Sequence, residues 1–318
     1  MKIGLIDVDN TGFPNLALMK LSKMSKNYGH SVEWYTPFDF YDCVYVSKVF
    51  TFTPDHGYFL NANTDAYFSG GTGYKDGCVM PEDAEILQPD YSIYNVPKDV
   101  AYGFLTRGCP NHCKWCIVPR NEGGIRPYND IEEIAIEGRK KIILMDNNIL
   151  AAGNYASEQL VKIIKKGYRV DFNQALDSRL VDDDFAELLA QIKWLSVIRF
   201  GCDTRSQIES CEKAIAKIRK FGYKGSFMLY TILYGDIYDC LSRIKYWRVD
   251  KRVSCFAQPY RDFENNNVIP QWQKDMSRWC NIVSIFRTVD FENYQPRKGF
   301  FCKKYFENNE FLKMSDNL

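Results

Sequence analysis

Arg107-Gly-Cys-Pro-Asn-His-Cys-Lys-Trp-Cys116 carries three thiols with the spacing C-x3-C-x2-C. The loop follows an apolar, strand-like run at Ala101–Thr106. Thiolates are the ligands that iron–sulfur clusters take, so a tight loop with three of them can hold one face of a cluster. Three protein ligands leave one iron of a four-iron cluster open, which favours chemistry at that iron over simple electron transfer.

A zinc site with a distant fourth ligand, or three unrelated thiols, are the alternatives to a cluster. Zinc sites usually combine two paired C-x2-C or Cys/His elements, and the chain offers no second pair. His112 is directly beside Cys113 and is expected to point elsewhere. We therefore expect Cys109, Cys113 and Cys116 to ligate a [4Fe-4S] cluster.

The flanks Leu105-Thr-Arg-Gly-Cys-Pro110 and Cys116-Ile-Val-Pro119 make the loop resemble the radical S-adenosylmethionine (SAM) enzyme superfamily. They are most similar to two branches, the proteins with an N-terminal cobalamin-binding domain and the methylthiotransferases. The resemblance implies that SAM chelates the open iron through its amino and carboxylate groups. It further implies that one electron from the reduced cluster cleaves SAM to methionine and a 5′-deoxyadenosyl radical, which abstracts hydrogen from a substrate.

Composition limits the class of protein and its location. The chain has 318 residues and is 46% apolar, with a net charge of +1 and no basic block that would indicate a nucleic-acid partner. No apolar run is long enough to cross a membrane, and the first residues do not form a signal peptide. Eleven cysteines without a secretion signal favour a reducing cytoplasm, so we expect a cytoplasmic protein.

Strand and helix patterns predict an α/β protein of three parts. Residues 1–95 are expected to form a small Rossmann-like domain. Residues 96–260 contain six strand–helix repeats, which predict parallel βαβ units and match the partial (βα)6 TIM-like barrel of the resembled superfamily. Residues 261–318 are expected to form a helical cap, with a helix at Trp272–Phe286 and an aromatic tail over the barrel mouth or its open side. The six expected strands are Ala101–Thr106, Lys141–Met145, Arg169–Asn173, Ser196–Phe200, Ser226–Thr231 and Val253–Ala257.

The first domain resembles a degenerate cobalamin-binding domain. Asp7-Val-Asp-Asn-Thr-Gly12 mimics the D-x-H-x-x-G motif, with Asp9 where the cobalt-ligating histidine would be. Relatives without that histidine also bind cobalamin, so Asp9 weakens the expectation of cobalamin without removing it. We nevertheless expect none, because aromatic side chains are numerous enough to fill the cleft. These are Phe38, Phe40, Tyr41, Phe50, Phe52, Tyr58 and Phe59, of which Tyr58 and Phe59 lie outside the residues described below.

Polar residues at the ends of the expected barrel strands are the candidate SAM ligands. By the resemblance, Asp146, Asn147 and Asn148 after the second strand bind the amino group of SAM, although Asx residues also favour plain turns. At the end of the fourth strand, alternation of side chains places Arg199, Gly201 and Asp203 on one face. By the resemblance, Arg199 is expected to pair with a carboxylate, Asp203 to accept from ribose, and Gly201 to let the cofactor approach. Further candidates for SAM or substrate are Asn173, Gln174, Asp177, Arg179, Gln258 and Arg261.

The remaining features leave the reaction open. Cys202 and Cys255 are expected at strand ends facing the cavity, where a thiol could relay a radical. Methylthiotransferases need three further N-terminal cysteines, and only Cys43 and Cys78 precede the loop, so that branch is disfavoured. We expect a radical SAM enzyme that receives electrons from a donor such as flavodoxin or ferredoxin and modifies an unknown small molecule, peptide or nucleotide. The alternative is a non-catalytic iron–sulfur protein for electron transfer or sensing.

Overall fold

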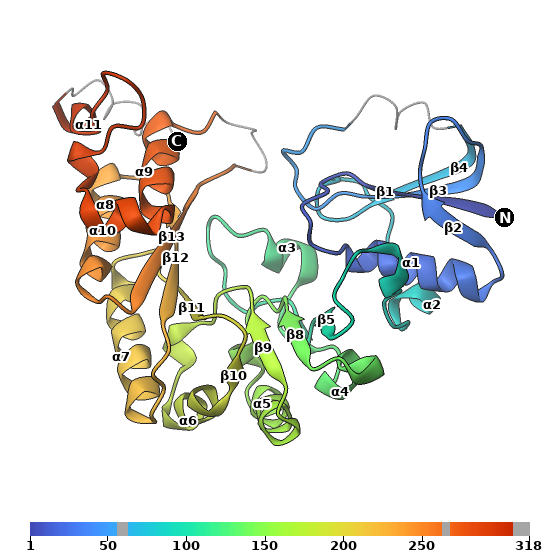
Figure 1. Ribbon diagram of the computed structural model, residues 1–318, viewed down its shortest axis with the longest axis horizontal. Helices are drawn as coiled ribbons and strands as arrows, with labels where there is room; N and C mark the ends of the chain where they lie inside the picture. The colour runs from blue at the N-terminus through green and yellow to red at the C-terminus, as the bar shows by residue number, and fades with distance from the viewer. Residues whose placement is uncertain (56–62, 263–267, 308–318) are drawn as a thin grey trace. The chain divides into compact units, whose positions relative to one another are not determined.

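The computed structural model describes residues 1–55, 63–262 and 268–307, which divide into two compact units (Figure 1). One unit contains Met1–Gly103 and Glu132–Arg139, and the other contains Phe104–Ile131 and the chain from Lys140 onward. The sequence led us to place boundaries near residues 95 and 260, whereas the described residues after 260 pack within the second unit. Among the described residues, no helix is both long and apolar enough to span a bilayer.

The first unit is built on a parallel sheet whose strands lie in the order β2 (Ser31–Trp34), β1 (Lys2–Asp7), β3 (Tyr41–Ser47) and β4 (Thr64–Gly70). The four central residues of β1 are buried, as a strand covered on both faces requires. Helix α1 (Leu16–Asn27) follows, and Asn15 caps it by accepting from two backbone amides of its first turn. This order of parallel strands with a helical crossover confirms the Rossmann-like layer.

A buried arginine ties the return segment to the rest of the first unit. The chain leaves the sheet through the short helix α2 (Glu82–Glu85) and strand β5 (Val100–Gly103). Arg139 donates to the carbonyls of Val100 (2.7 Å) and Pro97 (3.2 Å). Its guanidinium also lies 3.8 Å from the ring centroid of Tyr91, a cation–π contact. These contacts explain why residues 132–139 belong to the first unit.

The second unit contains two groups of parallel strands. β10 (Lys193–Trp194), β9 (Arg169–Phe172) and β8 (Lys141–Leu144) form one group, and β11 (Ile198–Gly201), β12 (Phe227–Leu233) and β13 (Val253–Pro259) form the other. A bridge between Leu176 and Phe200 links them. Buried residues alternate with partly exposed ones along β8, β11 and β12, so one face of each strand is covered and the other is more open.

Helices cover the outer face of these strands. They are α5 (Asn154–Lys166), α6 (Asp183–Gln191), α7 (Ser206–Lys220) and α8 (Ile237–Tyr246), each following the strand that the sequence predicted (Figure 1). Gly167 ends α5 in the left-handed conformation that favours glycine. Asp182 and Asp236 cap α6 and α8 by accepting from backbone amides. The repeated strand–helix order confirms the predicted α/β fold class.

The chain after β13 adds to the helical layer. We expected one helix at Trp272–Phe286, but Ile282 adopts an extended backbone and divides the segment into α9 (Gln271–Asn281) and α10 (Val283–Thr288). The side-chain amide of Asn281 accepts from Ala257 N at 2.7 Å and donates to Ala257 O at 3.0 Å. The amide of Asn281 therefore bonds the edge of β13 where a further strand would otherwise pair.

The aromatic residues near the C-terminus pack against helices. Trp279 is fully buried, with ring centroids 5.2 Å from Phe286 and 5.4 Å from Phe291. Phe306 in the short helix α11 (Lys304–Glu307) contacts Tyr238 of α8 at 5.1 Å. We expected the tail over the barrel mouth or its open side; in the described part, Phe306 packs against α8.

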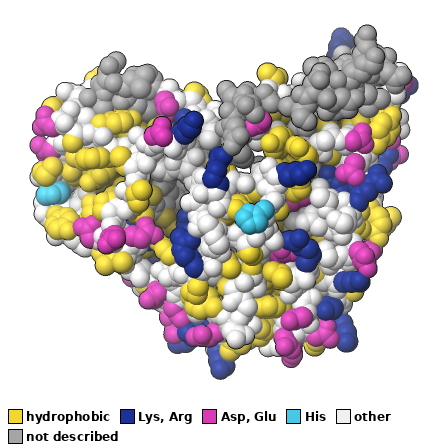
Figure 2. Space-filling model, turned by 180° about the vertical axis from the view of Figure 1, so that it is seen from behind, with side chains coloured by type: hydrophobic (Ala, Val, Ile, Leu, Met, Phe, Trp, Pro, Cys, Tyr) yellow, Lys and Arg dark blue, Asp and Glu magenta, His cyan; other side chains and the backbone are white. Residues whose placement is uncertain are grey.

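The surface mixes charges of both signs. The chain carries 41 Lys and Arg residues and 40 Asp and Glu residues, which gives its near-zero net charge. On the face drawn in Figure 2, basic and acidic side chains alternate with apolar ones. Many pair directly, as Lys213 does with Glu209 one helical turn before it (2.5 Å).

Candidate iron–sulfur and SAM site

The three cysteines lie on a loop between strand β6 (Thr106–Arg107) and helix α3 (Val118–Glu122) in the second unit. Cys109 is buried, Cys113 is half-buried and Cys116 is exposed. Burial raises the pKa of the Cys113 and Cys116 thiols, and the nearby thiols raise it further. Cationic iron would reverse this effect, because metal binding favours the thiolate. Within the described parts of the chain, no three His, Cys, Asp or Glu side chains are grouped to hold a single metal ion.

Gly108 fixes the entry to the cysteine loop. Its φ of 80° lies in the left-handed region that favours glycine. A Cβ atom at this position would lie 2.2 Å from the carbonyl oxygen of Gly124, so no side chain fits. Cys109 N donates to the carbonyl of Gly123 at 3.1 Å. The loop therefore folds back on its own exit, and strand β7 (Arg126–Pro127) pairs antiparallel with β6 to close it.

Glu122 holds the loop from the other end. Its Oε2 atom accepts from Gly108 N (3.0 Å), from Arg107 Nε (3.0 Å) and from Asn147 Nδ2 (3.1 Å). One carboxylate oxygen thus joins the loop entry, the end of α3 and the turn after β8. The sequence reasoning missed this residue, because its position after the third cysteine has no spacing that marks it.

Asp146 lies beneath the loop and supports it. The residue is 3% exposed, and its carboxylate accepts from Leu105 N (3.2 Å), Thr106 N (2.5 Å) and Thr106 Oγ1 (2.7 Å). Burial raises the pKa of the Asp146 carboxyl to about 6. Both oxygens are occupied by the strand that leads into the cysteine loop. The structure thus gives Asp146 a positioning role, and its contact with SAM stays a prediction.

Asn147 and Asn148 connect the same turn to the loop. Asn147 donates to Glu122, and Asn148 Nδ2 lies 3.6 Å from Cys109 Sγ as a hydrogen-bond donor. Asn148 is 3% exposed, and its Oδ1 atom has no hydrogen-bond partner within the protein. A buried acceptor without a partner is costly unless a ligand supplies the donor. The turn therefore reaches the cluster ligands directly and leaves one acceptor for a bound molecule.

The turn after β9 also reaches the cysteine loop. Asn111, between the first two cysteines, donates to Asp177 Oδ2 at 3.0 Å. Arg179 makes two hydrogen bonds to the same carboxylate, at 2.8 and 2.6 Å. These contacts hold the pKa of Asp177 below its usual range, against the opposing effect of burial. Two of the candidates in this turn thus pair with each other and anchor the loop.

Asn173 and Gln174 differ in their surroundings. Asn173 is half-buried, its carbonyl accepts from Tyr230 Oη at 3.0 Å, and its buried Oδ1 has no partner within the protein. Gln174 is exposed. Asn173 therefore has the same unmet acceptor as Asn148, and ligand contact by either Asn173 or Gln174 stays a prediction.

Arg199 and Gly201 share the strand face that alternation predicted, but Arg199 already has a partner. Its guanidinium forms an ion pair with Asp171 of the neighbouring strand and donates to the carbonyl of Phe172 at 3.3 Å. Its buried Nε has no partner within the protein. A Cβ atom on Gly201 would make only ordinary contacts, so packing within the chain does not require glycine there.

Asp203 lies at the end of the same strand. Its Oδ1 accepts from Ile232 N at 2.8 Å, and burial raises the pKa of its carboxyl. Its charge also raises the pKa of the Cys113 and Cys116 thiols, which places it near the cysteine loop. Asp203 is thus a strand-end carboxylate beside the predicted cluster.

The structure corrects the expected positions of Cys202 and Cys255. Cys255 lies on the buried face of β13, where Cys280 of α9 donates to its carbonyl with an S···O distance of 3.6 Å. Cys202 is 1% exposed, and a hydrogen bond with Cys211 of α7 lowers the pKa of its thiol. Both thiols pack against helices, so the expectation that they face a cavity at the strand ends is wrong.

Part of this chain is similar in sequence to known proteins. No family model matches the chain. The ribosomal protein uS12 methylthiotransferase RimO of Desulfitobacterium hafniense is 30% identical over 83 residues, which are 24% of this chain and 19% of that protein. RimO of Chromobacterium violaceum is 33% identical over 73 residues, 21% of this chain and 17% of that protein. The chain thus matches about a fifth of the length of these relatives.

The similarity to solved structures extends over most of the chain. The radical SAM methyltransferase TsrM of Kitasatospora setae, solved with its tryptophan substrate and the SAM analog aza-SAM, superposes with a TM-score of 0.61. The match covers 82% of this chain and 73% of that chain at 13% identity. A structure of TsrM with cobalamin and a [4Fe-4S] cluster bound superposes with a TM-score of 0.60, and the match covers 75% of that chain.

This chain has the radical SAM fold. The fold that the resemblance implied is thereby confirmed, and the branch with an N-terminal cobalamin-binding-like domain is consistent with the match. The residues of the candidate site fit the cofactors that the fold implies. Three thiols could ligate a cluster, and unpartnered buried atoms on Asn148, Asn173 and Arg199 could contact SAM.

The carboxyl edge of the first unit does not offer a cobalt ligand at the expected position. Asp9 accepts from Val49 N (2.5 Å), Phe50 N (3.4 Å) and Thr53 Oγ1 (2.5 Å), so its carboxylate holds the loop after β3. A histidine could not make this set of contacts, because a neutral imidazole has one acceptor nitrogen. In this chain the motif position serves loop structure.

The filled cleft that we expected beside Asp9 is not observed. Tyr41 is fully buried within the sheet, but the other described aromatic side chains of the set are exposed. Their exposed fractions are 93% for Phe38, 50% for Phe40, 39% for Phe50 and 43% for Phe52. The expectation of no cobalamin therefore depends on Asp9 alone.

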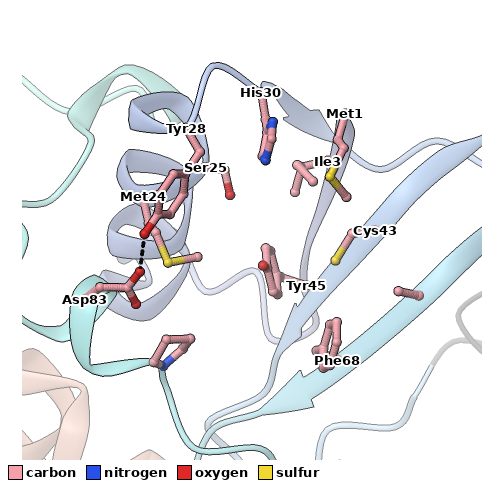
Figure 3. A pocket seen from close by; sticks show the side chains of 12 residues that line it. Met1, Ile3, Met24, Ser25, Tyr28, His30, Cys43, Tyr45, Phe68 and Asp83 are labelled. Carbon is pink, nitrogen blue, oxygen red and sulfur yellow. Dashed lines mark hydrogen bonds between the residues drawn. The ribbon is translucent and has the colours of Figure 1, made fainter.

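A separate cavity of about 380 Å³ lies in the first unit, at the start of β1 and the end of α1 (Figure 3). Its walls are mainly apolar, with Met24 of α1 facing Tyr45 and Phe68 of the sheet. The Tyr28 hydroxyl donates to Asp83 at 2.7 Å across one side. The cavity is at the amino ends of the strands, whereas ligands of such sheets bind at the carboxyl ends.

Proposed function

We propose that this chain is a radical SAM enzyme that holds a [4Fe-4S] cluster through Cys109, Cys113 and Cys116. The cluster and SAM would together supply a 5′-deoxyadenosyl radical by reductive cleavage, and that radical would modify a substrate yet to be identified. The observation that carries the proposal is the convergence of two strand-end turns on the cysteine loop. Asn148 contacts Cys109, and Asp177 contacts Asn111.

The residues of the chain have separable tasks in this proposal. Gly108, Glu122 and Asp146 fix the loop before any cofactor binds, because their contacts are within the protein. Asn148 and Asn173 present unmet acceptors, which suit the ammonium group of SAM. Arg199 supplies positive charge near the same edge, although Asp171 already neutralises part of it.

The reaction after radical formation is also a proposal. The RimO relatives match only about a fifth of their own length. We do not assign methylthiotransfer, because only Cys43 and Cys78 precede the loop; Cys43 is buried in β3 and Cys78 is exposed. We further propose that cobalamin is not required, since Asp9 is committed to the loop after β3. The cobalamin in the TsrM structure belongs to that protein.

The test is a SAM-binding measurement on anaerobically reconstituted protein. We expect about four irons per chain and a change in the electron paramagnetic resonance (EPR) spectrum of the reduced cluster when SAM is added. A flavodoxin or ferredoxin is the expected electron donor, and dithionite replaces it in the test. A cluster whose spectrum is unchanged by saturating SAM would favour the alternative, a non-catalytic iron–sulfur protein.

A further inference from the structure

Asn148 is the side chain outside the cysteine loop that contacts a predicted cluster ligand directly in the described structure. Its Nδ2 atom lies 3.6 Å from Cys109 Sγ, within the range of hydrogen bonds to sulfur. Both residues are buried, Asn148 at 3% and Cys109 at 9% exposure. Water therefore competes little for either group, and the low local dielectric strengthens the contact.

The chemistry of the thiolate fixes the orientation of the amide. A ligating cysteine is deprotonated and accepts hydrogen bonds, whereas an amide oxygen facing it would be repelled. The NH2 group of Asn148 therefore faces the sulfur, and Oδ1 points away from it. In agreement, Oδ1 is the buried atom that has no partner within the protein. The NH2 group of Asn148 thus contacts a predicted cluster ligand, and its Oδ1 atom can accept a hydrogen bond from a bound molecule.

The turn that carries Asn148 is held at three successive residues. Asp146 is bonded to Thr106, and Asn147 is bonded to Glu122. The carbonyl of Asn148 accepts from Ala151 N at 3.1 Å, which begins the following helical turn. The side chain is therefore positioned by the backbone on both sides and is not free to swing away from Cys109.

We propose that Asn148 is a positioning residue that donates an N–H···S hydrogen bond to the Cys109 thiolate. This hydrogen bond raises the reduction potential of the cluster. The proposal rests on the proposed function, because it requires the cluster. Reduction adds an electron that is shared with the sulfur ligands, so a donor at a sulfur stabilises the reduced state more than the oxidised state. Hydrogen bonds to the sulfurs are among the factors that set cluster potentials.

The test compares Asn148→Leu with Asn154→Leu by EPR-monitored redox titration of the reconstituted protein. Both replacements remove a side-chain amide, but Asn154 is exposed at the start of α5, and only Asn148 donates to the sulfur of Cys109. We expect the reduced-to-oxidised ratio of Asn148→Leu at a fixed potential to fall about tenfold, a shift of about 59 mV toward negative potential for one electron. Asn154→Leu should keep the wild-type potential, and both variants should keep the wild-type iron content.

A second measurement covers the case in which Asn148→Leu does not retain its cluster. Wild-type protein labelled with 15N only in its asparagine side-chain amides should show a 15N coupling to the reduced cluster in pulsed EPR. An unchanged potential in Asn148→Leu, an equal shift in Asn154→Leu, or an absent 15N coupling would each overturn the proposal. These readouts do not need SAM, so a protein that fails to bind SAM would refute the proposed function while leaving this test intact.

Discussion

Glu122 Oε2 accepts a hydrogen bond from the backbone N–H of Gly108 at 3.0 Å, and so closes the cysteine loop across fourteen residues of chain. Gly108 precedes the first cysteine, and Glu122 ends the helix that follows the third. The same oxygen accepts from Arg107 and from Asn147. The loop geometry is therefore set by the protein, which would let the cluster assemble in a prepared site.

Glu122→Ala is expected to shorten the lifetime of the cluster without removing any of its ligands. The substitution leaves three hydrogen-bond donors without their acceptor. For a partly buried group, this costs about 1–3 kcal/mol of folding free energy. Iron loss to a chelator under anaerobic conditions measures the effect. Glu187→Ala, on the exposed face of α6, is the matched control. Equal rates of iron loss in Glu122→Ala and the control would show that Glu122 does not hold the loop.

Gly108→Ala should abolish cluster assembly. The new Cβ would lie 2.2 Å from Gly124 O, and the residue would also keep an unfavourable φ of 80°. Gly222→Ala separates these two effects, because Gly222 has a φ of 93° but no atom within 4 Å of an added Cβ. We expect Gly222→Ala to lose about 1–2 kcal/mol of unfolding free energy and to bind iron normally. Full iron content in Gly108→Ala would refute the assigned loop geometry.

Asp146 should impose a specific pH dependence on stability. Burial raises the pKa of its carboxyl to about 6 from its usual value of 3.8, so the folded protein binds a proton more readily than the unfolded chain. Its contribution to stability is thus largest below about pH 4 and falls as pH rises toward about 6, by up to about 3 kcal/mol. Asn at this position cannot titrate. The difference in unfolding free energy between wild type and Asp146→Asn, measured from pH 4 to 7, should therefore change with pH in this direction. A difference that does not depend on pH would show that the Asp146 carboxyl has an ordinary pKa.

Asp9 is expected to support the first unit and not a corrinoid. Asp9→Ala removes the acceptor for Val49 N and Thr53 Oγ1, at a cost of about 1–3 kcal/mol in the stability of this unit. Asp65→Ala, on exposed β4 surface, is the control and should have little effect. Wild-type protein expressed with ample cobalamin should purify without corrinoid absorbance. Stoichiometric corrinoid in that preparation would contradict the proposal and point to radical methylation.

The sequence predicted the elements whose signal is local. The C-x3-C-x2-C spacing, the strand patterns and the turn-forming Asx residues all belong to short stretches, and the structure has the elements in those places. Alternation also placed Arg199 and Gly201 on one strand face. The same rule applied to β13 would have put Cys255 with buried Val253 and Ala257, so that error came from ignoring the period of two.

The contacts that the sequence could not predict join residues that are distant along the chain. Asp171 pairs with Arg199, which lies 28 residues further along the chain, because their two strands lie near each other. Asp146 reaches Thr106 across 40 residues, and Glu122 reaches Asn147 across 25. Each depends on how strands and turns pack in space, which local propensity does not encode. Residue types at the site were thus predictable, whereas their division into supporting and ligand-facing roles required the structure.

The most direct test of the central claim is the release of 5′-deoxyadenosine. Anaerobically reconstituted protein, given dithionite and SAM, should form 5′-deoxyadenosine and methionine in equal amounts even without substrate. A variant with Cys109, Cys113 and Cys116 all replaced by Ala should form neither and should carry no iron. Wild-type protein that holds about four irons yet releases no 5′-deoxyadenosine, or a triple variant that releases as much as wild type, would contradict the claim that this chain is a radical SAM enzyme.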